Sequence, residues 1–351
     1  MKRIALIAAA LVVVLVAAGW IATRDAGVDV WLYRKAATRA MSAPDANLAG
    51  PGDLSVLLVG TGSPLPDTTR AGPSTLIAAE NSYYVVDTGI DSVRNLMLWR
   101  VKLDRISGVF ITHLHSDHIG ELGEIQLQTW VAGRRTPLKV YGPPGIERVV
   151  AGFNEAYALD DSYRTKHHGA DFLPPSASKL VAVVLQPGTS VTENGVKATA
   201  ILVDHGPVKP AYGYRFDYNG HSVTVSGDTI ASENLAHAAS GTDVLVHEAL
   251  NPELVGILGD AARAGGRLRA AKIMHDIPGY HTSPVEAARI ANAAHARLLV
   301  YTHLLPVLPD AIAERAFLRG VSDVRPDGVV LGHDGLVVKI GANGLEQSSL
   351  K

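Results

Sequence analysis

The ten residues 111–120, ITHLHSDHIG, decide the fold, because three histidines and one aspartate follow the apolar run GVFI within six positions. Side chains two apart on a strand point to the same side, so His113 and His115 can share one ion. Asp117 and His118 can turn toward a second ion if the chain leaves the strand there. A single histidine is usually a core or surface residue, but four ligand-type side chains so close together indicate a metal site. Imidazole and carboxylate suit Zn²⁺, with iron or manganese as alternatives.

Further candidate ligands follow apolar runs later in the chain. They are His205 in AILVDHG, Asp228 in VTVSGDT, His247 and Glu248 in DVLVHEA, and His303 in LLVYTH. Any one of them alone favours a capping or core role. Together they indicate ligands that follow strands and converge on one rim of a sandwich, as at other α/β sites.

The rest of the pattern predicts an α/β protein. The 351 residues are 47% hydrophobic and 19% charged, as in a globular chain with a large core. From residue 54 onward, two successive halves of several strands plus helices predict two sheets face to face with helices outside, a four-layer αβ/βα sandwich. YNGH at 218–221 predicts a tight hairpin, and Asp334-Gly335 predicts another near the C-terminus. An irregular polar stretch is expected at 159–178.

The segment HLHSDH at 113–118 matches the H-x-H-x-D-H signature of the metallo-β-lactamase superfamily. More narrowly, the chain resembles the ribonuclease Z and arylsulfatase-like branch of that superfamily. Shared features are the GTGSP-x-P loop with its following arginine, the GYR strand, SGDT, HEA and YHTSP, in that order between residues 55 and 334. So many ordered motifs are specific for the fold and much less so for the substrate.

The resemblance implies two zinc ions per chain and seven ligands. One ion is assigned to His113, His115 and His205, the other to Asp117, His118 and His303, with Asp228 bridging both. Two such ions lower the pKa of a bridging water and supply hydroxide as the nucleophile.

The resemblance also implies the residues that support this chemistry. His281 occupies the position of a proton donor to the leaving group, and Glu248 orients it or shares its proton. His281, Glu248 and Asp117 are therefore the expected catalytic residues. Asp87 in VVDTG is expected to hold the ligands in place from behind, and His247 is expected either to do the same or to have a structural role.

The N-terminus predicts a membrane helix. Residues 4–21 carry no charge and would form a helix of about 27 Å, close to the ~30 Å hydrocarbon core. The predicted organisation is a signal anchor or signal peptide at 1–23, a linker containing a short helix at 24–52, and the metallo-hydrolase domain at 53–351. Lys2 and Arg3 place that domain outside the inner membrane, anchored and facing the periplasm, or periplasmic or secreted after cleavage.

The substrate is expected to be a small ester. Ribonuclease Z grips transfer RNA with a long arm between the third-motif histidine and the bridging aspartate, but only 22 residues separate His205 from Asp228 here. A net charge of −2 adds no electrostatic footprint for nucleic acid, so no nucleic-acid partner is expected. The stretch 159–178 and the segment 251–280, with its arginines, are expected to shape the pocket.

The expected function is therefore an extracytoplasmic dinuclear zinc hydrolase of small esters, phosphodiesters or sulfate esters first. A lactonase or β-lactamase-like hydrolase is the alternative within the same class. A mononuclear-iron oxidoreductase of the same fold and a non-catalytic zinc-binding protein are alternatives of other classes. The sequence indicates no oligomeric state, and the absence of cysteine excludes thiolate ligands and disulfides.

Overall fold

The computed structural model divides the chain into two units, Met1–Asp45 and Ala46–Lys351. The residues that it describes are 11–14, 16, 19–20 and 26–350. In the first unit, helix α2 (Ala26–Met41) covers the segment where a short helix is expected. Most of the apolar run 4–21 lies outside the described residues. Within the described part, no helix is long and apolar enough to cross a membrane, so the predicted membrane helix has no support.

The second unit is built on two sheets. The eight-stranded sheet contains, from edge to edge, β15 (Gly344–Ser349), β14 (Leu336–Gly341), β1 (Leu54–Gly60), β2 (Ser74–Ala79), β3 (Ser82–Val86), β4 (Ile106–Phe110), β5 (Leu138–Gly142) and β6 (Leu180–Val184). The seven-stranded sheet contains β13 (Val329–Leu331), β12 (Leu298–Leu305), β11 (Val244–Leu250), β10 (His221–Val225), β9 (Val208–Tyr218), β8 (Val196–His205) and β7 (Ser190–Glu193). Strands β3 to β6 run parallel, and so do β10 to β13, so in each set the carboxyl ends meet at one edge.

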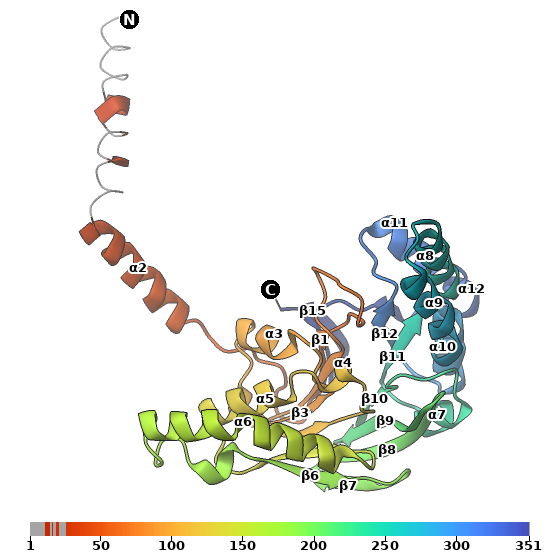
Figure 1. Cartoon of the computed structure of the whole chain (residues 1–351), viewed down its shortest axis with the longest axis horizontal. Helices are drawn as coiled ribbons and strands as arrows, with labels where there is room; N and C mark the ends of the chain where they lie inside the picture. The colour runs from red at the N-terminus through yellow and green to blue at the C-terminus, as the bar shows by residue number, and fades with distance from the viewer. Residues whose placement is uncertain (1–10, 15, 17–18, 21–25, 351) are drawn as a thin grey trace, which may run out of the picture. The chain divides into compact units, whose positions relative to one another are not determined.

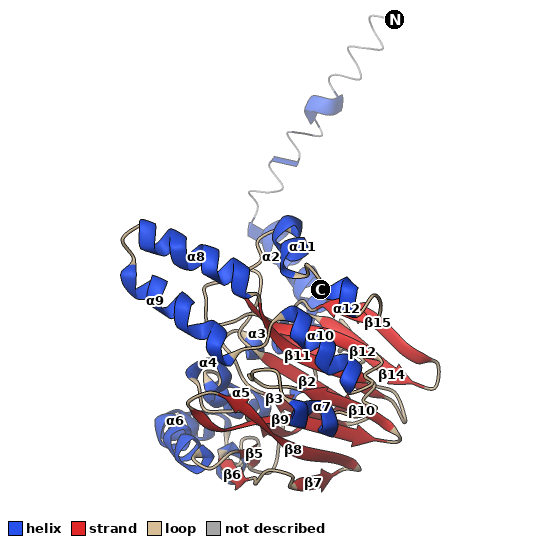
Figure 2. Ribbon diagram, turned by 90° about the vertical axis from the view of Figure 1, so that its right-hand side faces the viewer, coloured by secondary structure: helices blue, strands red, loops and turns tan. Residues whose placement is uncertain are grey.

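Helices cover the outer face of each sheet (Figures 1 and 2). The first sheet packs against α3 (Ser92–Leu98), α5 (Leu122–Val131) and α6 (Ile146–His168). The second packs against α7 (Glu233–Ala238), α10 (Pro284–Ala293), α11 (Ala311–Phe317) and α12 (Val321–Val324). A third core lies between the sheets, where Phe110 stacks on Tyr141 and meets Phe216 edge-on. The predicted α/β fold with two facing sheets is confirmed.

Of the local predictions, one hairpin is confirmed and two others are wrong. The YNGH hairpin is present, since Tyr218 pairs with His221 between β9 and β10. The predicted hairpin on Asp334-Gly335 is wrong, because β13 and β14 belong to different sheets. The Asp334 carboxylate instead accepts hydrogen bonds from Thr61 and from the Ala71 amide. These bonds connect the segment between β13 and β14 to the loop after β1. The irregular stretch expected from residue 159 is also wrong at its start, since α6 continues to His168.

The segment expected to shape the pocket forms two helices, α8 (Pro252–Ala264) and α9 (Leu268–Asp276), followed by a short 3-10 turn. The two helices run side by side and protrude beyond the sheets (Figure 2). They pack closely because Gly259 of α8 has no side chain. A Cβ built there would lie 3.2 Å from the Cβ of Met274. We call α8, α9 and the loop joining them the α8–α9 hairpin.

Candidate active site

The metal-site motif lies just beyond strand β4, between the two sheets. The strand ends at Phe110, so His113 and His115 do not sit on it as the sequence suggested, and His115 instead precedes helix α4 (Ser116–Ile119). The Thr112 carbonyl accepts a hydrogen bond from the amide of Tyr212 on β9 in the opposite sheet. This bond joins the segment after β4 to the second sheet. It places His113 and His115 at the rim where polar residues follow the later strands.

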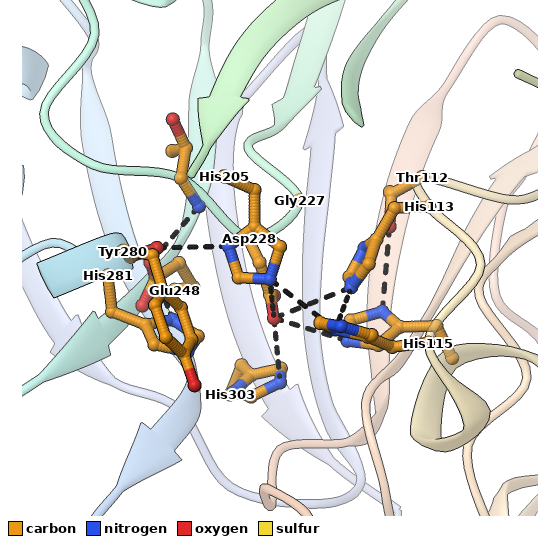
Figure 3. Close-up of polar contacts among 12 residues, drawn as sticks. Thr112, His113, His115, His205, Gly227, Asp228, Glu248, Tyr280, His281 and His303 are labelled. Atoms are coloured by element: carbon orange, nitrogen blue, oxygen red, sulfur yellow. Dashed lines mark hydrogen bonds and ion pairs between the residues drawn. The ribbon is translucent and has the colours of Figure 1, made fainter. Parts of the chain in front are cut away.

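Asp228 lies at the centre of this rim and is buried, with 3% of its surface exposed. Its Oδ2 lies 3.3 Å from His303 Nε2, 3.4 Å from His118 Nε2, and 3.9 Å from the Nε2 atoms of His113 and His205 (Figure 3). The residue before it, Gly227, has φ of +62°, and a Cβ there would meet the Tyr212 carbonyl oxygen at 2.3 Å. Only glycine fits, and its turn directs the Asp228 carboxylate among the four imidazoles.

Two groups of donors flank Asp228. On one side, His115 Nδ1 lies 2.9 Å from His113 Nε2 and 3.4 Å from His205 Nε2. On the other, Asp117 Oδ2 lies 3.5 Å from the Nε2 atoms of both His118 and His303. The structure thus brings together all seven predicted ligands in overlapping groups, with Asp228 close to histidines of both sides.

Hydrogen bonds from behind fix the orientation of several of these rings. Asp87 Oδ2 lies 2.8 Å from His118 Nδ1, and the same carboxylate accepts from the amide and hydroxyl of Thr112. His205 Nδ1 lies 2.9 Å from the Tyr280 carbonyl oxygen and donates to it. Each bond leaves Nε2 directed to the centre, which is how outer partners orient metal-binding histidines.

The donor set fits a metal centre. His118 Nε2 and both ring nitrogens of His303 are buried and make no hydrogen bond to any described residue. Buried polar atoms are rarely left without a partner, and an ion would satisfy these. Burial, with neighbouring imidazoles, lowers the pKa of His113 well below its ordinary value, which favours the neutral ring that binds metal. Although burial opposes it, His303 and His118 hold the pKa of Asp228 well below its usual range. The His/Asp groups are thus compatible with a dinuclear site.

His281 and Glu248 form a pair beside the candidate ligands, and His281 is itself grouped with His205 and Asp228. His281 Nδ1 lies 3.1 Å from Glu248 Oε1, which also accepts from the amides of Thr229 and Thr282. Burial opposes the protonation of His281, but the carboxylate of Glu248 outweighs it and raises the pKa to about 9. The ring therefore holds a proton at neutral pH and presents Nε2 for donation. His247 is fully buried, and its Nδ1 lies 2.7 Å from the Glu248 carbonyl oxygen, outside the ligand groups.

A cavity of about 240 Å³ opens onto these residues. Its polar wall includes His115, Asp117, His205, Asp228, His281 and His303, and its apolar wall includes Leu65, Ile273, Met274, Ile277 and Leu305. Tyr280 also lines it, and it falls in the segment 251–280 that was expected to shape the pocket, although the sequence assigned it no role of its own. The stretch 159–178 does not line the cavity, contrary to expectation, whereas the segment 251–280 does.

A buried cluster of imidazoles and carboxylates between two helix-covered sheets defines a metal-dependent hydrolase of the αβ/βα class. The chain belongs to the metallo-β-lactamase superfamily, whose family model matches residues 67–303. A ribonuclease Z of Mycobacterium bovis (strain BCG / Pasteur 1173P2) is 36% identical over 258 residues, 73% of this chain and 87% of that protein. A ribonuclease Z of Mycobacterium sp. (strain KMS) is 34% identical over 80% of this chain and 94% of its own length.

Solved structures share the fold. The metallo-β-lactamase fold protein YhfI from Bacillus subtilis superposes with a TM-score of 0.58 at 19% identity, over 82% of this chain and 99% of that one. The short form of human tRNase Z gives a TM-score of 0.55 at 20% identity, over 81% and 98% of the two chains. At these identities the likeness concerns the fold alone.

The relatives correct the expected substrate. They carry the name of a ribonuclease, which overturns both the small-ester hydrolase outside the membrane and the expectation of no nucleic-acid partner. The 22-residue spacing between His205 and Asp228 stands, but it does not exclude RNA, since the chain spans most of these relatives' length. The arylsulfatase-like side of the resemblance has no support. A net charge summed over the whole chain does not exclude a nucleic-acid partner either, because it does not show how the charges are distributed over the surface.

The expected location and membrane partner are corrected as well. Both rested on a helix at 4–21 that would anchor the chain in the inner membrane or export it to the periplasm. No helix among the described residues is long and apolar enough to cross a membrane. The relatives, as ribonucleases, lend the expected location no support either.

Proposed function

We propose that this chain is a ribonuclease of the ribonuclease Z kind, which hydrolyses a phosphodiester bond of an RNA substrate with two zinc ions. The observation that carries the proposal is the Asp228 carboxylate set among four imidazole Nε2 atoms and flanked by two donor groups. The choice of RNA is supported by relatives named ribonuclease Z that are 34–36% identical over most of their length.

The seven residues would hold the two ions in the division that the resemblance to the superfamily implies. His113, His115 and His205 would bind one ion, Asp117, His118 and His303 the other, and Asp228 both. When bound, two divalent ions supply a nucleophile of hydroxide strength at neutral pH and stabilise charge on the phosphoryl oxygens.

His281 is proposed as the proton donor. Because Glu248 accepts from Nδ1, the proton on Nε2 faces the cavity, where the leaving oxygen of the ribose must depart. Glu248 is itself fixed by the amides of Thr229 and Thr282, so it holds the ring in one orientation. An alkoxide leaving group needs such protonation, which typically contributes about 10²–10⁴-fold to the rate.

The test uses the full chain, purified, stripped of metal and reloaded with zinc. A precursor transfer RNA with a 3′ extension is the first RNA to try, because of the resemblance to ribonuclease Z. We expect two zinc ions per chain and zinc-dependent cleavage, with Asp228→Asn prepared identically to expose contaminating nucleases. Two bound zinc ions and hydrolysis of bis(p-nitrophenyl) phosphate without cleavage of any RNA would reject the RNA substrate. Failure to bind zinc would reject the metal site.

A further inference from the structure

We infer that the α8–α9 hairpin is a clamp for the RNA backbone, which binds phosphates of the substrate outside the catalytic cavity. The inference rests on the proposed function and adds a surface that nothing in the ligand motifs assigns. It concerns three arginines at the protruding end of the hairpin, Arg263, Arg267 and Arg269.

The three arginines are exposed and uncompensated. Arg263 lies in the last turn of α8, Arg267 directly precedes α9 without capping it through its side chain, and Arg269 follows in the first turn, so the joining loop brings them to one end. None makes an ion pair with a described residue, whereas Lys272 on the same helix is held by Asp276 at 2.7 Å. Only one acidic residue of α8, Asp260, lies near this end. Unpaired guanidinium groups gathered on a protrusion are suited to phosphate oxygens.

The same helix connects these arginines to the cavity. Ile273 and Met274 of α9 both line the cavity that contains Asp117 and His281. Residues four apart share one face of a helix, so Arg269 lies one turn outward from Ile273 on the side that faces the cavity. At 1.5 Å per residue, the nine residues of α9 span about 13 Å. A phosphodiester chain that enters the cavity therefore passes along α9 within reach of Arg269, with the other two arginines farther out.

The close packing of the hairpin supports a fixed binding surface. Gly259 and Met274 are both buried at the contact between the helices, and Asn251 caps α8 by accepting from the Leu254 amide. The Asn251 side chain also donates to the Phe317 carbonyl oxygen, which anchors the base of the hairpin to α11. The arginines thus stand on a braced pair of helices, so less ordering is needed when RNA binds.

The experiment compares two triple variants of the zinc-loaded full chain. The test variant is Arg263→Gln, Arg267→Gln and Arg269→Gln, and the control variant is Arg148→Gln, Lys197→Gln and Arg289→Gln, which removes the same charge from exposed positions elsewhere. Kinetics are measured on precursor transfer RNA and on bis(p-nitrophenyl) phosphate between about 50 and 200 mM salt.

For the test variant we expect KM for RNA to rise by about tenfold or more, with kcat changed by less than about twofold. The slope of log KM against log salt should fall by about 2, near 0.7 for each phosphate contact on a single strand. Arg269→Gln alone should account for the largest share. The small diester does not reach the hairpin, so its kcat/KM should stay within about twofold of the unchanged chain.

Two results would overturn the inference, and they differ. An unchanged KM and salt slope for RNA in the test variant, with RNA still cleaved, would reject the clamp alone. The proposed ribonuclease function would then stand without it. An equal rise in KM for the control variant would show a general charge effect and reject the clamp as well. If the unchanged chain hydrolyses the diester but no RNA, the proposed function itself fails.

Discussion

The rim that carries the seven candidate metal ligands, called the rim below, and the α8–α9 hairpin lie beside the same cavity and are built in opposite ways. The rim gathers side chains from both sheets, and Asp228, His113 and His303 are almost completely buried. The hairpin is one continuous segment, and the arginines that we propose bind RNA are exposed on it. The rim thus depends on the whole fold, whereas the hairpin depends on two helices. We expect changes at the rim to abolish chemistry on every substrate, and changes at the hairpin to alter only how large substrates bind.

The largest effect should come from Asp228→Asn. The variant keeps the shape but removes the charge that lies among four imidazoles, 3.3–3.9 Å from their Nε2 atoms. We expect kcat/KM to fall by more than about 10³-fold on RNA and on the small diester alike, beyond the 10–100-fold typical of residues that only support a ligand. Metal content should drop below two ions per chain. Activity within tenfold of the unchanged chain would show that Asp228 is not essential to the chemistry at the rim.

His281 tests whether the rim needs a proton donor, and the leaving group provides the contrast. His281→Gln should lower kcat on RNA by about 10²-fold or more, and much less on bis(p-nitrophenyl) phosphate, whose phenolate leaves without protonation. Equal losses on both substrates would contradict the assignment.

The same pair predicts a pH dependence. Glu248 raises the pKa of His281 to about 9, so the protonated donor is present below that pH and activity on RNA is lost as pH rises through it. Glu248→Gln removes the group that raises the pKa, so the loss should begin at lower pH. If the pH profile of kcat/KM does not move in this variant, Glu248 does not set the pKa of the proton donor.

Support behind the rim should matter less than the rim itself. Asp87→Asn removes the charge that accepts from His118 Nδ1, while the amide still fits the backbone, whose φ is +60°. We expect zinc affinity or kcat/KM to fall by about 10–100-fold. Thr112→Val is the milder companion, since it deletes only the hydroxyl that lies 2.8 Å from the Asp87 carboxylate. If Asp87→Asn matched Asp228→Asn in severity, the distinction between ligands and their supports would be lost.

What the sequence could predict follows the same division. The seven candidate ligands that the structure brings together could be predicted because metal chemistry favours histidine and aspartate, and because strand ends of two sheets meet at one rim. Tyr280 was missed because it supports His205 through its backbone carbonyl, which leaves no mark on residue type. The segment around Asp334 was predicted to be a hairpin but connects the two sheets. Local turn residues do not reveal that Asp334 has a partner as distant in the sequence as Thr61. The substrate was misjudged because the short spacing between His205 and Asp228 and the near-neutral total charge were taken to exclude RNA, and neither observation does.

The smallest effect concerns the packing of the hairpin itself and is isolated by two glycines of α8. Gly256 faces open space, so Gly256→Ala should stabilise the chain by about 1 kcal/mol through helix propensity alone. In Gly259→Ala the same gain is opposed, because the new Cβ would lie 3.2 Å from the Cβ of Met274 and the helices must separate slightly. We expect Gly259→Ala to fall short of Gly256→Ala by about 1 kcal/mol in denaturant unfolding, the order of a small overpacking penalty. It should raise KM for RNA by less than about threefold and leave the small diester unaffected. Equal stabilisation by both variants would show that the helices have room to spare, and the hairpin would then be looser than the rim in packing as well as in exposure.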